Sequence, residues 1–127
     1  MRFLSMIRIN ENAGVKVTDQ LMHDMGVLMG EMTREGTLVR TAGLRPTGEA
    51  RRVHYKGGQL TTSDGPFTET KEVIGGYALL EARDMAHAVE LTERFLKVHG
   101  PEWNITCEVR QVDGGEFGPD APMPSGS

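Results

Sequence analysis

The sequence predicts one α+β domain of the split βαβ type, with a β-hairpin inserted between its two halves. The strand and helix patterns follow the order strand, helix, strand, hairpin, strand, helix, strand. Both helix patterns are amphipathic, so we expect two helices on one face of an antiparallel sheet. The domain is expected to span residues 1–113, and residues 114–127, rich in Gly, Pro and Ser, are expected to form a flexible tail.

The first half of this plan has clear boundaries. Residues 2–9 alternate in polarity as a strand does. A helix is predicted between Thr18, an N-cap residue, and Gly36, a C-terminal stop. A second strand is expected over Thr37–Gly43. The buried stripe of the helix is predicted from apolar residues at helical spacing: Leu21, Met25, Leu28 and Met32.

One side of this helix carries His23 with Gly26 and Gly30 in the same column. Each glycine inside a helix costs about 1 kcal/mol relative to alanine, so a compensating role is expected. We favour close packing of the helix against the sheet as that role. The alternative is a notch that leaves room for a ligand beside His23.

A hairpin is predicted over residues 51–63, because Gly57-Gly58 is typical of a two-residue primed turn. Counting outward from this turn pairs Tyr55 with Leu60 and Val53 with Thr62, and it places these four side chains on one face. The same count places Asp64 opposite Arg51, at the edge of this apolar patch.

The second half repeats the strand, helix, strand order. Val73–Ala82 is apolar at both alternating sets of positions, which predicts a strand covered on both faces, and Gly75-Gly76 within it indicates a bulge or a close approach. Asp84 is the expected N-cap of a helix over residues 85–99, and residues 105–112 are the last expected strand. The inward face of that helix is predicted as Met85, Val89, Phe95 and Leu96.

Two helices on one face leave the other face of the sheet without cover. A symmetric homodimer would cover it, and the mixed side chains that include Arg8, Glu108 and Arg110 suit an interface with a polar pocket. A small-molecule ligand in that cavity is the expected partner.

Composition limits the other partners and the compartment. The net charge of −4 is spread along the chain, so nucleic acid is not an expected partner. We find no apolar run of membrane-spanning length and no signal-peptide pattern, so no membrane partner is expected and the cytoplasm is the expected compartment. Cys107 is the only cysteine and is expected to be a reduced, buried thiol. We expect no metal and no cofactor, because no ligand spacing or cofactor motif is present.

The stretch DGPFTETKEVIGGYALLEA, preceded by TAGLRP and followed by EVRQV, resembles the DGPF-domain branch of the YCII-related family. The resemblance implies a ferredoxin-like fold and a homodimeric α+β barrel. Some members of that branch resemble parts or neighbours of extracytoplasmic-function sigma factors. Related YCII proteins have been regarded as possible enzymes with a His and Asp pair in a pocket, and His23 lies on the first helix as that histidine would.

Asp64 is the leading candidate for a functional acid, since burial would raise its pKa and Arg51 would lower it. Its alternative role is that of a turn residue that accepts backbone N–H groups. Tyr77 places a hydroxyl in a buried strand and needs a hydrogen-bond partner. The candidate ligand-binding residues are therefore Arg51, Tyr77, Glu69 and Lys71, although charges such as Glu69 and Lys71 on a loop are usually solvated.

These residues leave two functions open. The first is a small cofactor-free enzyme that uses Asp64 and His23 for acid/base chemistry on a small organic molecule in the dimer cavity. The second is a non-catalytic ligand-binding or regulatory module, including one linked to sigma-factor regulation.

Overall fold

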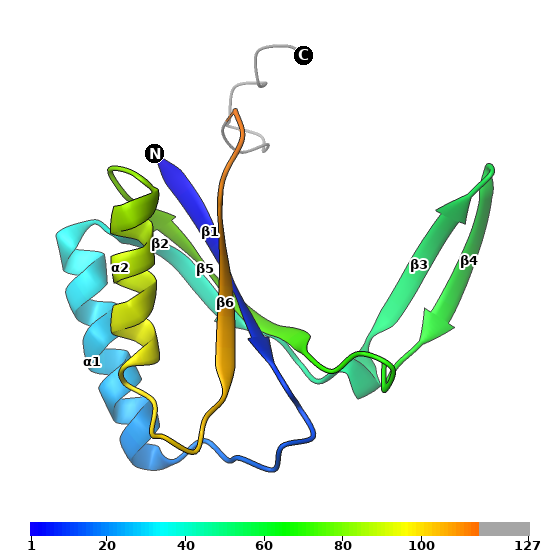
Figure 1. Cartoon of the computed structure of the whole chain (residues 1–127), viewed down its shortest axis with the longest axis horizontal. Helices are drawn as coiled ribbons and strands as arrows, with labels where there is room; N and C mark the ends of the chain where they lie inside the picture. The colour runs from blue at the N-terminus through cyan, green and yellow to red at the C-terminus, as the bar shows by residue number, and fades with distance from the viewer. Residues whose placement is uncertain (115–127) are drawn as a thin grey trace.

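The computed structural model describes residues 1–114, and the predicted tail after residue 114 lies outside them. Four antiparallel strands form a sheet in the order β2-β5-β1-β6, with both helices on one face, and a separate hairpin, β3-β4, projects from it (Figure 1). This arrangement is consistent with the predicted ferredoxin-like fold. The elements are β1 (Arg2–Ile9), α1 (Asp19–Glu35), β2 (Leu38–Gly43), the 3₁₀ turn η1 (Thr47–Glu49), β3 (Arg51–Lys56), β4 (Gln59–Asp64), β5 (Val73–Glu81), α2 (Met85–Leu96) and β6 (Ile105–Gln111).

The helices begin at the predicted caps. The Thr18 hydroxyl accepts a hydrogen bond from the Leu21 N–H at 3.1 Å, and the Asp84 carboxylate accepts one from the His87 N–H at 2.9 Å. Gly36 ends α1 in the left-handed region, at φ +79°. The second helix is three residues shorter than predicted. Neither helix in residues 1–114 has the length and apolar character needed to cross a membrane.

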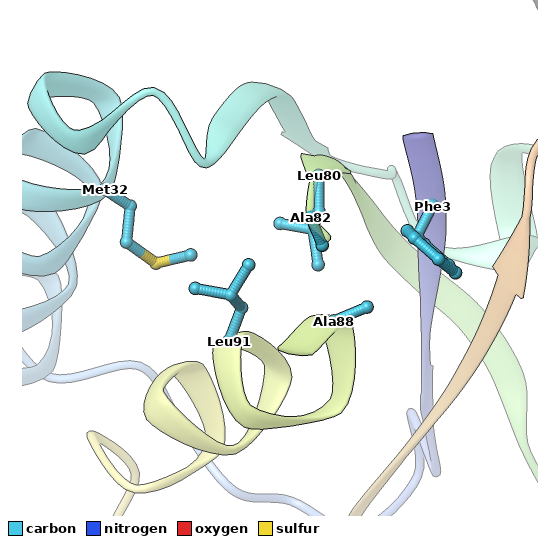
Figure 2. Packing of buried hydrophobic residues seen from close by; sticks show 6 residues of the cluster. All are labelled: Phe3, Met32, Leu80, Ala82, Ala88 and Leu91. Carbon is cyan, nitrogen blue, oxygen red and sulfur yellow. The ribbon is translucent and has the colours of Figure 1, made fainter. Parts of the chain in front are cut away.

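The core lies between the helices and the sheet. Phe3 of β1 is only 1% exposed, and apolar side chains of α1, α2 and β5 pack in the same cluster (Figure 2). Burying a side chain of this size contributes about 1.5–3 kcal/mol. The buried cluster consists of Phe3, Met32, Leu80, Ala82, Ala88 and Leu91.

The predicted inward face of α2 is wrong in part. Met85 and Val89 are exposed, and the buried face is formed by Ala88, Leu91 and Thr92. Small side chains let the helix lie close to the sheet, and the Thr92 hydroxyl donates to the Ala88 carbonyl at 3.0 Å, so this polar group can be buried. A search for large apolar residues alone overlooks such a face.

The other face of the sheet, which we call the open face, has no helix against it. Leu4 and Met6 of β1 and Tyr77 of β5 are half-buried there, and Leu79 is buried among its neighbours. We predicted that β5 is covered on both faces, but no element within residues 1–114 covers its second face. A bulge in β5 lies at Gly75, where a Cβ atom would be 2.6 Å from the Ile9 side chain.

No element among residues 1–114 packs against the glycine column of α1. A Cβ atom added at Gly26 would meet nothing within 4 Å, and at Gly30 only the Arg34 side chain at 3.4 Å. The favoured packing interpretation is thus wrong for a single chain. His23, beside these glycines, is exposed.

We therefore expect Gly26→Ala to raise the free energy of unfolding by about 0.5–1 kcal/mol, because alanine restricts the unfolded chain and meets open space. Gly36→Ala, at the left-handed position, is the matched control and should lower stability. Urea denaturation measures both values. A destabilised Gly26→Ala variant would contradict the open environment of Gly26.

Candidate functional site

The hairpin β3-β4, which we call the arm, has the predicted register. Tyr55 lies opposite Leu60, and Arg51 lies opposite Asp64. The Arg51 Nε atom is 3.2 Å from the Asp64 carboxylate, but both side chains are about three-quarters exposed. An exposed ion pair of this kind contributes about 0–1 kcal/mol. Asp64 therefore closes the base of the arm in a solvated position.

Residues 65–72, the DGPF loop, are held against η1 by contacts with Thr47. The Gly65 N–H donates to the Ala50 carbonyl at 2.9 Å. A Cβ atom on residue 65 would lie 1.7 Å from the Thr47 carbonyl oxygen, so only glycine fits there. The Phe67 N–H in turn donates to the Thr47 hydroxyl at 3.4 Å. The loop and η1 thus form one structural unit.

Glu11, from the loop after β1, ties the same unit to the sheet. Its carboxylate accepts hydrogen bonds from the Thr47 hydroxyl at 2.7 Å and from the Thr47 N–H at 3.0 Å. These bonds favour the charged form and lower the pKa of Glu11 below its ordinary value of 4.5. Thr47 therefore joins three segments that are distant in sequence.

Arg52, at the start of the arm, contacts three residues of the DGPF loop. Its guanidinium lies over the Phe67 ring, 3.7 Å from the ring centre, and it donates to the Thr70 hydroxyl at 3.3 Å and to the Glu69 carboxylate. The pKa of Glu69 is lowered, first by its own backbone N–H and then by Arg52. The predicted binding residue Glu69 is thus engaged by the chain itself.

A pocket of about 510 Å³ lies between the DGPF loop and the open face, at the base of the arm. Its volume falls within the usual range for small-molecule sites. Six elements or loops contribute to it (β1, η1, β3, the DGPF loop, β5 and β6), so the fold assembles it from distant segments. The lining residues are Met6, Arg8, Thr47, Arg52, Phe67, Thr70, Glu72, Val73, Ile74 and Glu108.

The charged groups of this pocket differ in how firmly they are held. Arg8 lies 4.0 Å from Glu108, which is a loose ion pair between half-exposed groups. Glu72 is half-buried and forms no hydrogen bond or ion pair with any residue among 1–114. Arg8 and Glu72 can therefore interact with a ligand without first losing a strong internal partner.

The predicted site residues are spread over the molecule. Arg51, Asp64 and Lys71 do not line the pocket. Lys71 lines a smaller hollow of about 20 Å³ on the DGPF loop, which shares Thr47, Phe67, Thr70 and Val73 with the pocket wall. Tyr77 is half-buried in the middle of the open face. Glu69 is bonded to the pocket wall through Arg52, and Tyr77 lies opposite the wall residue Met6 in the sheet.

His23 lies in a surface groove between α1 and α2, together with Asp24, Glu31 and Arg94. No residue of the DGPF loop lines this groove, so a single chain does not bring His23 and Asp64 into one hollow. Their pairing across two copies stays a prediction.

The sequence pointed to Arg8 and Glu108 as polar positions but overlooked Thr47, Arg52 and Thr70 as wall residues. Two features of the sequence could have indicated wall residues. Phe67 lies within the DGPF motif, and Arg52 lies on the face of the arm opposite its apolar side chains. Within residues 1–114 no cluster of three metal-ligating side chains is present. Half-buried Cys107 has its pKa raised by burial, so it is a protonated thiol at neutral pH.

We expect Gly65→Ala to lower the free energy of unfolding by about 1–3 kcal/mol, because the added Cβ would displace the Thr47 carbonyl and loosen the DGPF loop. Gly48→Ala, in the adjacent η1 turn, meets open space and is the control, with an expected change within about 0.5 kcal/mol. Thermal unfolding distinguishes them. Equal stability of the two variants would show that the loop does not depend on this contact.

Comparison with known proteins places the chain in a family. Residues 1–103 match the YCII-related domain. An uncharacterized protein of Rhizobium meliloti (strain 1021) is 29% identical over 72 residues, which cover 57% of this chain and 58% of that protein. The match thus spans little more than half the length of that relative. The domain match covers most of the chain, including all strands but the last, and the chain therefore belongs to the YCII-related family.

Proposed function

We propose that this protein binds a small organic molecule with an anionic group in the pocket between the DGPF loop and the open face. The observation that carries this proposal is the composition of the pocket wall. Arg8 and Arg52 supply guanidinium groups, and Met6, Phe67 and Ile74 supply apolar surface. Apolar walls with a few converging polar groups are typical of small-molecule sites.

The two arginines of the pocket wall are the reason for proposing a ligand with an anionic group. A guanidinium binds carboxylate or phosphate in a bidentate manner, and among residues 1–114 the ionic partner of Arg8 is Glu108 alone, at 4.0 Å. The Thr70 hydroxyl accepts from Arg52, so its proton remains a neutral donor on the same pocket wall, whereas the Thr47 hydroxyl already donates to Glu11. Glu72 and Glu108 line the same pocket, so a ligand that also carries a donor, such as a hydroxy or amino acid, suits it best.

The proposal includes a homodimer of the DGPF branch, in which a second copy covers the open face and encloses the pocket. Buried Leu79 and half-buried Leu4, Met6 and Tyr77 make the middle of this face apolar, and no element within residues 1–114 covers it. Enclosure would exclude water and strengthen the contact between Arg8 and an anion.

A thermal-shift screen of small carboxylates and phosphate esters tests the binding site. A compound that stabilises the wild type should bind Arg8→Met at least tenfold more weakly, because the guanidinium is lost while the apolar stem is kept. Arg83→Met, outside the pocket, is the control and should bind normally. Isothermal titration gives the affinities.

Asp64→Asn is made in the same series and should also bind normally, since Asp64 does not line the pocket. Equal affinity of Arg8→Met and wild type would overturn the placement of the ligand. A loss of affinity confined to Asp64→Asn would restore the earlier hypothesis of a site at Asp64.

A second candidate function is acid/base catalysis on the bound molecule, and the position of Glu72 favours it. A half-buried carboxylate that lines the pocket and has no partner in the described chain suits a general base. Asp64 and His23 would take part in this chemistry only if a second copy brought them to the same cavity.

Should a hit be turned over, we expect Glu72→Gln to lower kcat by about 10²–10⁴-fold while binding is largely kept, because the amide cannot take up a proton. Glu49→Gln, on an exposed carboxylate bonded to Arg45, is the matched control. Product formation followed by NMR gives kcat and KM for each variant. Undiminished turnover by Glu72→Gln would exclude this residue as the base.

A further inference from the structure

Within the described part of the chain, residues 1–114, no element packs against the apolar face of the arm. Val53, Tyr55 and Leu60 are 70%, 72% and 70% exposed, although they are neighbours on one face of the hairpin. The arm extends away from the helices and the main sheet (Figure 1). A two-stranded hairpin is marginal in water on its own, so a surface that covers this face would stabilise it.

The opposite face of the arm is already engaged by its own chain. Arg52 lies over Phe67, and the His54 ring is 3.0 Å from the Ser63 hydroxyl. Because side chains alternate along a strand, these contacts leave the face of Val53, Tyr55 and Leu60 pointing away from the DGPF loop. The apolar face is therefore available to another molecule.

We propose that this face packs against a second copy of the chain, as an extension of the contact that covers the open face. The inference rests on the homodimer of the proposed function. Three large side chains on each arm offer on the order of 400 Å². Two arms thus fall short of the roughly 1,200–2,000 Å² of a stable interface. The arm contact needs a larger neighbouring surface on the same partner.

A second copy supplies that surface. The open face begins at the base of the arm, because the pocket is lined by Arg52 of the arm and by Met6 and Ile74 of the sheet. In a two-fold dimer both apolar surfaces of each chain would be covered by the corresponding surfaces of the other. An unrelated partner seated on the arm alone would leave the open face bare.

The arm contact also bears on the pocket. Arg52 belongs to the same strand as Val53 and Tyr55, and its side chain reaches the pocket wall. An arm fixed on the second copy would hold Arg52 in its position over Phe67, and both residues line the pocket. Contact with the second copy is thus expected to increase the affinity of the pocket for its ligand.

The test is the double variant Val53→Thr with Leu60→Thr. Threonine keeps a β-branched side chain suited to a strand but adds a hydroxyl to the apolar face. We expect a wild-type dimer and an increase of at least tenfold in the dimer dissociation constant of the variant, measured by analytical ultracentrifugation over a dilution series. Lys56→Ala with Gln59→Ala, on the opposite face, is the control and should leave the constant unchanged.

A wild-type dimer with an unchanged constant in the threonine variant would overturn the arm contact and leave the homodimer standing. A monomeric wild type would overturn both, while the ligand site would still be judged by Arg8→Met. Hydrogen exchange of the wild-type arm keeps the proposal testable if the double variant misfolds. Backbone amides of residues 59–64 should be at least tenfold better protected above the dissociation constant than below it, and equal protection would overturn the contact.

Discussion

The close contact between Gly65 and the backbone of Thr47 is the constraint on which the candidate site depends. The carbonyl oxygen of Thr47 occupies the space that a side chain at position 65 would fill. Thr47 also donates to Glu11 and accepts from Phe67, so it joins η1, the loop after β1 and the DGPF loop. The DGPF motif is therefore first a structural element, which sets the path of the chain between the arm and β5.

Local interactions explain which features could be predicted from the sequence. The register of the arm follows from Gly57-Gly58, because a two-residue turn determines every pair that follows. The helix starts follow from Thr18 and Asp84, whose side chains bond to backbone groups three residues away. In each case the determining contact lies within a few residues along the chain.

The pocket depends on contacts of another kind. Thr47, Arg52 and Glu108 reach it from separate parts of the chain, and only the packed loop and sheet bring them together. The alternation of the first strand placed Arg8 on the face that carries both polar and apolar side chains. It could not show which residues from other segments lie near Arg8. The inward face of α2 was mispredicted for a related reason, because Ala88 and Thr92 are buried by their fit to the sheet rather than by apolar size.

The position of Asp64 in the structure makes it a weaker candidate for the catalytic acid or base than Glu72. A general acid or base must lie within hydrogen-bond reach of the bound molecule, so it has to face the cavity that holds this molecule. Asp64 is instead about three-quarters exposed and paired with Arg51 at the base of the arm, where water screens both charges. Glu72 is half-buried in the pocket with no bonded partner among the described residues, so it meets the requirement better. A second copy that covered the open face would remove water from around Glu72, whereas Asp64 would take on a catalytic role only if that copy reached the base of the arm.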